Sequence, residues 1–525
     1  MRKLCRMIFS RYFISAIIIL AELALIFYLT FSAYEYSWYA LALITVVNVI
    51  VLISLINRNA NPEYKVSWLV VVMLLPPFGA VIYALFYSRR VSPKKARFMR
   101  NVQNNLDLIS DTGEGLYEER DTEFSRLKEL DSLAAGKAFA ILNDDRLANL
   151  YLQSASDFFA HGEDMYESML RDVASAQKFI FLEYFIIEDG KMWGEIHRLL
   201  VEKVKSGVEV RVMYDDIGCM KTLPSHYDRR LNAEGIKCVR FSPVTPRIST
   251  THNNRDHRKI LIVDGKLAYT GGINLADEYI NEKQRFGHWK DGGIRLSGAA
   301  AEGLLKLFLA AWDFTVGSLT DAGKYLSPDK SAESVDVHEA SDGGFYIPFG
   351  SGPAPIYTRP VGNNVLLNII NQASKYVYIT TPYLVVDYDL TESLRNAALR
   401  GVDVRIITPG VADKKIIKVM TKSAYPYLMD AGVRIYEYKP GFIHEKTVVS
   451  DDLYALIGTI NLDYRSLVHH YEDAVWIYAS PTVISVKDEF LKTVALSDER
   501  DEREARLTPL EWVVRNLVRI FAPLL

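Results

Sequence analysis

The sequence contains little cysteine and carries almost no net charge. Its three cysteines, Cys5, Cys219 and Cys238, are too few and too widely spaced for a disulfide framework or a cysteine-rich metal site. The chain has 61 lysine and arginine residues against 64 aspartate and glutamate residues, so its formal net charge is −3. Proteins that bind polyanions usually carry an excess of positive charge, and we therefore predict no nucleic-acid partner.

Long hydrophobic runs, by contrast, are present near the N-terminus. The 525 residues are enough for two units of catalytic size and a membrane segment. Residues 12–33 and 38–56 are each long enough to cross a bilayer as a helix. A third run, residues 68–87, contains Pro76 and Pro77, which interrupt a helix. Residues 1–90 are therefore predicted to form a membrane segment.

The positions of lysine and arginine around these runs predict their topology. Four basic residues precede the first run, none lies between the first two, two lie between the second and third, and six follow soon after the third. Three crossings would divide these charges six and six, whereas a third run that enters and returns would leave all twelve on one side. The positive-inside rule favours the second arrangement. We predict two transmembrane helices and a re-entrant hairpin in the cell membrane, with the catalytic units on the cytoplasmic side. Three plain crossings are the alternative, because kinked helices also tolerate proline.

Composition and pattern divide the rest of the chain. Residues 91–150, of mixed charge, predict a linker with helical pieces. Residues 151–317 and 345–500 each contain the order strand, helix, strand, and residues 318–344 predict a connecting loop rich in small and polar residues. Because such repeats form βαβ units, we predict an α/β fold of two pseudo-symmetric units with mostly parallel sheets.

Residues 507–525 predict an amphipathic C-terminal helix. Thr508 and Glu511 form a capping box, with proline at the first helical position. Glu511, Arg515 and Arg519 share one face, and apolar residues cover the rest. Such a helix either packs into the core or lies on the bilayer surface, and the sequence leaves both open.

One motif, His-x-Lys-x4-Asp, occurs twice with a spacing of 187 residues, the difference between positions 257 and 444. Each copy leads into an apolar run and then a turn of small residues that carries an asparagine. The residues are His257, Lys259, Asp264 and Asn274 in the first copy, and His444, Lys446, Asp451 and Asn461 in the second. The β-branched runs predict strands, and alternation along a strand places each histidine and its lysine on the same side.

A histidine beside a lysine is suited to a phosphate oxyanion, because the imidazole can attack or protonate while the ammonium supplies charge. The two asparagines add amide donors to the same oxygens. If the copies converge, the resulting site fits a phosphodiester and requires no metal or other cofactor. Asp264 and Asp451 are either part of this site, as partners of the lysines, or turn residues that serve the fold; we slightly favour the latter.

A catalytic imidazole also needs an acceptor for its second nitrogen. Asp291 and Glu472, downstream of the two motifs, are the candidate orienting carboxylates. Each qualifies only if its strand lies beside a motif strand, which the sequence alone does not decide.

These residues resemble the phospholipase D superfamily, and their surroundings are similar to those of bacterial cardiolipin synthases. The similarity extends from about residue 159 to the C-terminus. The stretches that carry it are residues 257–266, 271–279, 439–447 and 461–466. The chain departs from the family pattern at residues 298–300 and 459–460, outside the histidine, lysine and asparagine set.

The resemblance implies phosphatidyl transfer between two phosphatidylglycerol molecules, giving cardiolipin and glycerol, at a bilayer and without a cofactor. It implies that His257 is the nucleophile and His444 the acid and base, while the lysines and asparagines hold the phosphate oxygens. A phospholipase D-type hydrolase, or a transferase that uses another alcohol, would carry the same motifs. A nuclease is disfavoured by the absence of a basic bias. A non-catalytic lipid-binding protein would be expected to have lost one motif, and both are intact.

Overall fold

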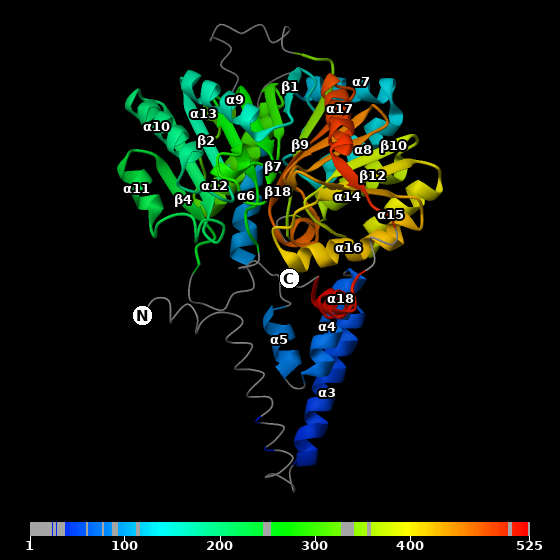
Figure 1. Cartoon of the computed structure of the whole chain (residues 1–525). Coiled ribbons are helices and arrows are strands. Elements are labelled where there is room, and N and C mark those ends of the chain that lie inside the picture. The colour runs from blue at the N-terminus through cyan, green and yellow to red at the C-terminus, as the bar shows by residue number, and fades with distance from the viewer. Residues whose placement is uncertain are drawn as a thin grey trace. The chain divides into compact units, whose positions relative to one another are not determined.

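The computed structural model describes residues 24, 28, 37–58, 61–75, 78–86, 93–111, 116–244, 254–326, 341–353, 357, 359–501 and 507–522. The chain divides into two compact units (Figure 1). The smaller unit comprises residues 1–91, 244–253 and 509–525, and the larger comprises residues 92–243 and 254–508. Both predicted catalytic halves lie within the larger unit, so they share one folded body.

Each half of the larger unit is built on one sheet. The strands of the first sheet, in spatial order, are β4 (Lys237–Phe241), β3 (Glu209–Asp215), β2 (Phe179–Tyr184), β5 (Lys259–Val263), β6 (Leu267–Gly271), β8 (Gly293–Gly298) and β1 (Ser154–Phe159). Those of the second are β19 (Ser497–Glu499), β13 (Arg434–Tyr438), β12 (Asp403–Pro409), β10 (Tyr376–Thr380), β15 (Thr447–Ser450), β16 (Tyr454–Gly458), β18 (Glu472–Tyr478) and β9 (Phe345–Ser351). Apart from β19, the two orders correspond strand for strand, which is the pseudo-symmetry that the sequence predicts.

The sheets are mixed, so the prediction of mostly parallel sheets was wrong. Within the two large sheets, only β2–β3 and β3–β4 in the first half, and β10–β12 and β12–β13 in the second, are parallel pairs. The motif strands β5 and β15 instead pair antiparallel with both neighbours. For β6 and β16 the reason is local: tight turns at Asp264-Gly265 and Asp451-Asp452 join each motif strand to the next as a hairpin, and hairpins give antiparallel pairs.

Helices cover the sheets and fill the space between the halves. Those of the first half are α9 (Gly162–Ser175), α10 (Lys191–Lys205), α11 (Tyr227–Ala233), α12 (Ala301–Val316) and α13 (Gly323–Leu326). Those of the second are α14 (Val361–Gln372), α15 (Tyr388–Leu399), α16 (Lys415–Met429) and α17 (Pro481–Ala495). Helix α12 is apolar almost all round because it contacts β5 and β6 of one half and β9 of the other. Gly303 on this helix lies so close to Pro348 of β9 that an added Cβ would sit 2.8 Å from its ring.

The segment predicted as a linker with helical pieces contains three helices, α6 (Pro93–Asp111), α7 (Leu116–Leu130) and α8 (Ser132–Asp144). Asp131 caps α8 by accepting from the backbone N–H groups of Leu133 and Ala134. The same carboxylate accepts from Tyr478 of β18 at 3.1 Å, so the helices are tied to the second sheet.

The smaller unit is a cluster of helices: α3 (Ser37–Ile56), α4 (Pro62–Leu74), α5 (Phe78–Phe86) and α18 (Pro509–Phe521). Helices α4 and α5 lie on either side of the two prolines and pack closely, with the rings of Trp68 and Tyr83 5.4 Å apart. Gly79 permits this approach, since an added Cβ would lie 2.4 Å from the carbonyl oxygen of Val71.

Within the described ranges, no helix is long and apolar enough to cross a membrane. The predicted transmembrane helix at residues 12–33 lies almost wholly outside those ranges, and the spans predicted at 38–56 and 68–87 are not confirmed. Helix α18 contacts α4, and none of the described residues of α18 is buried. The structure therefore does not show the first of the two alternatives for residues 507–525, a helix packed into the core.

Candidate active site

The segments that carry the two histidines each pair with the opposite half of the larger unit. Before β5, the N–H of His257 donates to the carbonyl oxygen of Tyr471 at 2.8 Å. After the short strand β14 (Gly441–Ile443), which pairs in parallel with β7 (His288–Lys290), the N–H of His444 donates to the carbonyl oxygen of Lys290 at 2.7 Å. The residue after each accepting carbonyl is a carboxylate, Glu472 in one case and Asp291 in the other.

These backbone pairings place each carboxylate against the histidine of the other half. His257 Nδ1 lies 2.8 Å from Oε2 of Glu472, and His444 Nδ1 lies 2.6 Å from Oδ2 of Asp291. All four side chains are buried. Both carboxylates are predicted from the sequence, but which histidine each one faces is not. That choice depends on the pairing of β7 with β14 and of Asp256 with Tyr471.

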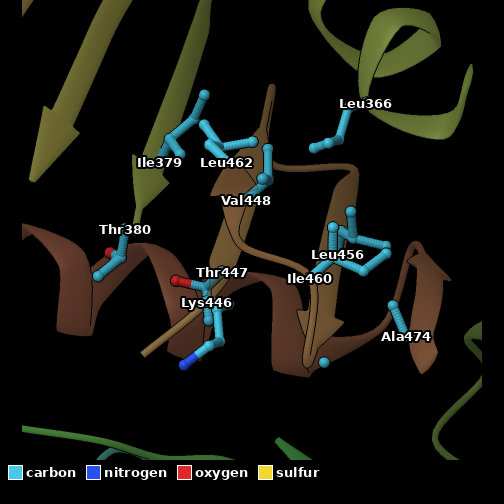
Figure 2. A pocket seen from close by; sticks show the side chains of 11 residues that line it. Leu366, Ile379, Thr380, Lys446, Thr447, Val448, Leu456, Ile460, Leu462 and Ala474 are labelled. Atoms are coloured by element: carbon cyan, nitrogen blue, oxygen red, sulfur yellow. The ribbon is translucent and has the colours of Figure 1, made fainter. Parts of the chain in front are cut away.

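The two lysines reach the same region. Lys259 Nζ donates to the carbonyl oxygen of His257 at 2.6 Å, and Lys446 Nζ lies 2.8 Å from Nδ1 and 3.1 Å from Nε2 of His444. Figure 2 shows how the stem of Lys446 is held: it borders a small pocket lined mainly by apolar side chains, and its amine points away from them. The charge of Lys259 acts on His444 as well as on His257, so the two motifs form one electrostatic site.

Burial determines the protonation of these groups. It lowers the pKa of His257 to about 3 and that of His444 well below its usual value, so both imidazoles are neutral at pH 7. Burial also lowers the pKa of Lys259 to about 8 and that of Lys446 to about 7. A bound phosphodiester anion would raise all four values, because a nearby negative charge favours the cationic forms.

The two carboxylates differ in how they are held. Glu472 accepts from the hydroxyls of Thr459 and Ser466 as well as from His257. Burial alone would raise the pKa of Glu472, but His257 and then His470 beside it lower that pKa below the usual range. Asp291 accepts from the N–H of Gly292 at 2.9 Å, and burial raises its pKa to about 6.

The two asparagines are not equivalent. Asn274 accepts from the N–H of Ile186 at 3.0 Å and donates to the hydroxyl of Tyr279 at 2.6 Å, so most of its amide is used locally. The side-chain oxygen of Asn461 is buried and has no hydrogen-bond partner among the described residues. Asn461 therefore keeps a free acceptor, whereas the amide of Asn274 both accepts and donates within the protein.

The aspartates of the motifs lie at the far ends of β5 and β15 from the histidines. Asp264 accepts from the N–H groups of residues 177, 178 and 179 at 2.7–2.8 Å, and Asp451 accepts from those of residues 374, 375 and 376 at 2.8–3.0 Å. Both have positive φ, at 54° and 59°, as the turns require. The structure does not bring Asp264 or Asp451 to the histidines, and each instead holds the loop before a neighbouring strand.

Sequence analysis did not identify several residues around the histidines. His470 lies with its ring centroid 5.4 Å from that of His257, and Phe185 lies 5.0 Å from His257 on another side. Around His444, the rings of Tyr279 and Trp289 have centroids at 5.6 Å and 5.5 Å. The available signals were the position of His470, two residues before Glu472, and that of Tyr279, at the end of a stretch that resembles the family.

The strand order and the paired histidines define the class of protein: a phospholipase D-like fold duplicated within one chain. The family model described as "Cardiolipin synthase, PLD-like domain" matches residues 169–285 and 366–494. A second family model, "Phospholipase_D-nuclease N-terminal", matches residues 46–86.

Curated relatives extend the similarity over most of the chain. An uncharacterised protein of Streptococcus mutans serotype c is 38% identical over 475 residues, 90% of this chain and 98% of that protein. Cardiolipin synthase 2 of Bacillus anthracis is 31% identical over 474 residues, 89% of this chain and 88% of that protein. Among solved structures, phosphatidylserine synthase of Haemophilus influenzae Rd KW20 matches with a TM-score of 0.54 and 16% identity, covering 74% of this chain and 98% of that one, a likeness of fold. The chain belongs to the phospholipase D-type cardiolipin synthase family, and the protein is a phosphatidyltransferase.

Proposed function

We propose that the protein is a membrane-bound cardiolipin synthase that transfers a phosphatidyl group from one phosphatidylglycerol to another and releases glycerol. The observation that carries this proposal is the crossed pairing of His257 with Glu472 and of His444 with Asp291. Two imidazoles, each oriented by a carboxylate of the opposite half, can divide one displacement into two steps at a single phosphorus atom. Curated relatives are named cardiolipin synthase, which supports cardiolipin as the product.

In the first step His257 is the nucleophile. Its Nδ1–H donates to Glu472, which leaves the lone pair of Nε2 free to attack phosphorus. A P–N bond forms and the P–O bond to glycerol breaks. His444, which the bound phosphate anion favours in its cationic form, gives its Nε2 proton to the leaving oxygen and becomes neutral. In the second step His444 removes a proton from the hydroxyl of another phosphatidylglycerol, whose oxygen attacks phosphorus and breaks the P–N bond.

The lysines and asparagines hold the lipid phosphate. Lys259 and Lys446 hold the phosphate anion through their positive charge. The bound anion in turn stabilises the cationic form of both lysines. Asn461 donates to the substrate oxygens through the N–H groups of its side-chain amide, whereas Asn274 has one N–H left beside its contacts to Ile186 and Tyr279. Asp264 and Asp451 serve the fold.

The N-terminal segment anchors the protein in the cell membrane, with crossings at residues 12–33 and 38–56 and a re-entrant hairpin at residues 68–87. Support comes from the N-terminal family match and from the exposed apolar side chains of α3, among them Leu43, Ile50 and Ile53. Helix α18 lies on the bilayer through Leu510, Trp512 and Leu517, which are more than half exposed. Cysteines introduced beside Lys94 should resist a membrane-impermeant reagent in intact cells; labelling from outside would contradict a cytoplasmic location.

The decisive assay uses purified protein and phosphatidylglycerol vesicles, with cardiolipin and glycerol measured together. His257→Ala and His444→Ala should each lose at least about a thousandfold in rate, because both act on the reacting atoms. His161→Ala is the matched control, since the side chain of His161 makes no capping hydrogen bond at the start of α9. Equal turnover by all four proteins would contradict the proposal. Phosphatidic acid as the main product would indicate the hydrolase instead.

A further inference from the structure

A third histidine lies beside the His257–Glu472 pair and takes no part in the proposed chemistry. His470 is 8% exposed, and its Nδ1 is buried with no hydrogen-bond partner among the described residues. That nitrogen lies 3.7 Å from Oε1 of Glu472, beyond hydrogen-bond distance. A buried polar atom left without a partner is costly, so its retention at this position requires a reason.

The positions of the three side chains match the requirements of a metal ion. One ligand atom from each of His257, His470 and Glu472 lies within 4.8 Å of the other two. A tetrahedral zinc ion with bonds of about 2.1 Å holds its ligands about 3.4 Å apart. His257 Nδ1 lies 2.8 Å from Oε2 of Glu472, and His470 Nδ1 lies 3.7 Å from Oε1 of the same carboxylate, so both imidazoles lie near the ligand spacing of zinc on the two oxygens of one carboxylate.

The chemistry of the donors agrees with the geometry. Two imidazoles and a carboxylate are the ligand set of catalytic zinc sites that keep a fourth position open. Burial keeps His257 neutral, and Glu472 is ionised, which are the forms that bind a metal. The hydroxyls of Thr459 and Ser466 already hold the carboxylate and would orient it toward an ion.

We propose that His257, His470 and Glu472 form an inhibitory site for a divalent transition-metal ion such as Zn²⁺. The ion binds His257 through Nδ1, the nitrogen that faces Glu472, and displaces the hydrogen bond between them. The proton of that imidazole then resides on Nε2, so the lone pair that attacks phosphorus is lost. Mg²⁺ does not substitute, because it prefers oxygen ligands in octahedral geometry.

Metal binding is tested on the full-length protein in detergent, stripped of metal and without lipid substrate, by equilibrium dialysis against Zn²⁺. Wild type and the matched control His469→Asn should bind one zinc ion that His470→Asn binds more than about tenfold less tightly. An equal affinity in His470→Asn, or no stoichiometric binding by wild type, would overturn the site. Because this measurement needs no turnover, it stands or falls independently of the proposed function.

Inhibition, which rests on the proposed role of His257, is tested on phosphatidylglycerol vesicles. Zn²⁺ should inhibit wild type and His469→Asn reversibly, with recovery on adding a chelator, whereas Mg²⁺ at the same concentration should not inhibit. His470→Asn should retain in zinc the rate that the same variant shows without zinc. Binding at the site without inhibition would refute the inhibitory role, and equal inhibition of His470→Asn would show that zinc acts elsewhere.

Discussion

Replacing Asp291 by asparagine tests how His444 is oriented, because the structure dictates which way the new amide must face. Oδ1 of Asp291 accepts from the N–H of Gly292 at 2.9 Å, while Oδ2 faces His444 Nδ1 at 2.6 Å. The asparagine oxygen must stay against Gly292, because a buried N–H without an acceptor is costly. The amide nitrogen, a donor, then faces His444 and forces the imidazole into the tautomer protonated on Nε2.

The size of the effect follows from that tautomer. A neutral His444 protonated only on Nε2 cannot remove the proton of the incoming alcohol, and without the carboxylate its cation is no longer stabilised. Replacing a buried orienting carboxylate by its amide costs on the order of 10⁴-fold in rate for this reason. This loss corresponds to about 5.4 kcal/mol of transition-state stabilisation. It should appear in kcat rather than KM, because Asp291 orients the catalytic base and we place it outside contact with the lipid.

The assay is the initial rate of glycerol release from phosphatidylglycerol vesicles. Asp313→Asn is the matched control, a buried aspartate of the same half that accepts from Thr320 and contacts neither histidine. With a phosphatidyl nitrophenol substrate, whose leaving group needs no proton, the first step of the Asp291→Asn variant should recover most of its rate. Wild-type turnover on phosphatidylglycerol, or no recovery with the nitrophenol substrate, would refute the proposed role of His444.

Three further predictions concern the same larger unit. Burial lowers the pKa of Lys446 to about 7 and that of Lys259 to about 8, so kcat/KM should fall as pH rises through 7. Lys446→Arg stays charged and should move this fall toward pH 8. An unchanged pH profile would exclude Lys446 as the group that titrates. Gly272→Ala would place a Cβ 1.9 Å from Asp291 Oδ1, so it should displace that carboxylate and lose activity. Combined with Asp291→Asn in a double variant, it should cause little further loss. Additive losses would show that the two substitutions do not act through the same carboxylate. Asp264→Asn should lower the free energy of unfolding by about 1–3 kcal/mol in denaturant titrations while kcat stays near wild type, whereas a selective loss of kcat would make that aspartate catalytic.

The duplicated core could be predicted from sequence because its signals are local. Alternating β-branched residues and two matching motifs mark β5 and β15 as equivalent strands, and the structure shows equal strand orders around them. The parallel arrangement was predicted wrongly because the pattern of a strand does not encode the direction of its neighbour. The turns at Asp264 and Asp451 decide that direction, and their positive φ values appear only in the structure.

The site divides in the same way. The residue types and their spacing identify His257 and His444 as candidate catalytic imidazoles. They also identify Glu472 as a candidate acceptor for an imidazole N–H. Their pairing depends on contacts between residues 215 positions apart for His257 with Glu472 and 153 positions apart for His444 with Asp291, which no local pattern encodes. His470 was missed because its one signal, a position two residues before Glu472, does not distinguish a histidine beside the site from an ordinary core residue.

The most direct measurement is to locate the covalent intermediate. Phosphatidylglycerol labelled with ³²P at the phosphate is mixed with enzyme, the reaction is stopped within one turnover, and labelled peptides are mapped. We predict an acid-labile label on His257, absent from His257→Ala. Label on His444 would reverse the proposed roles of the two histidines, and full turnover without label on either would contradict a phosphohistidine route.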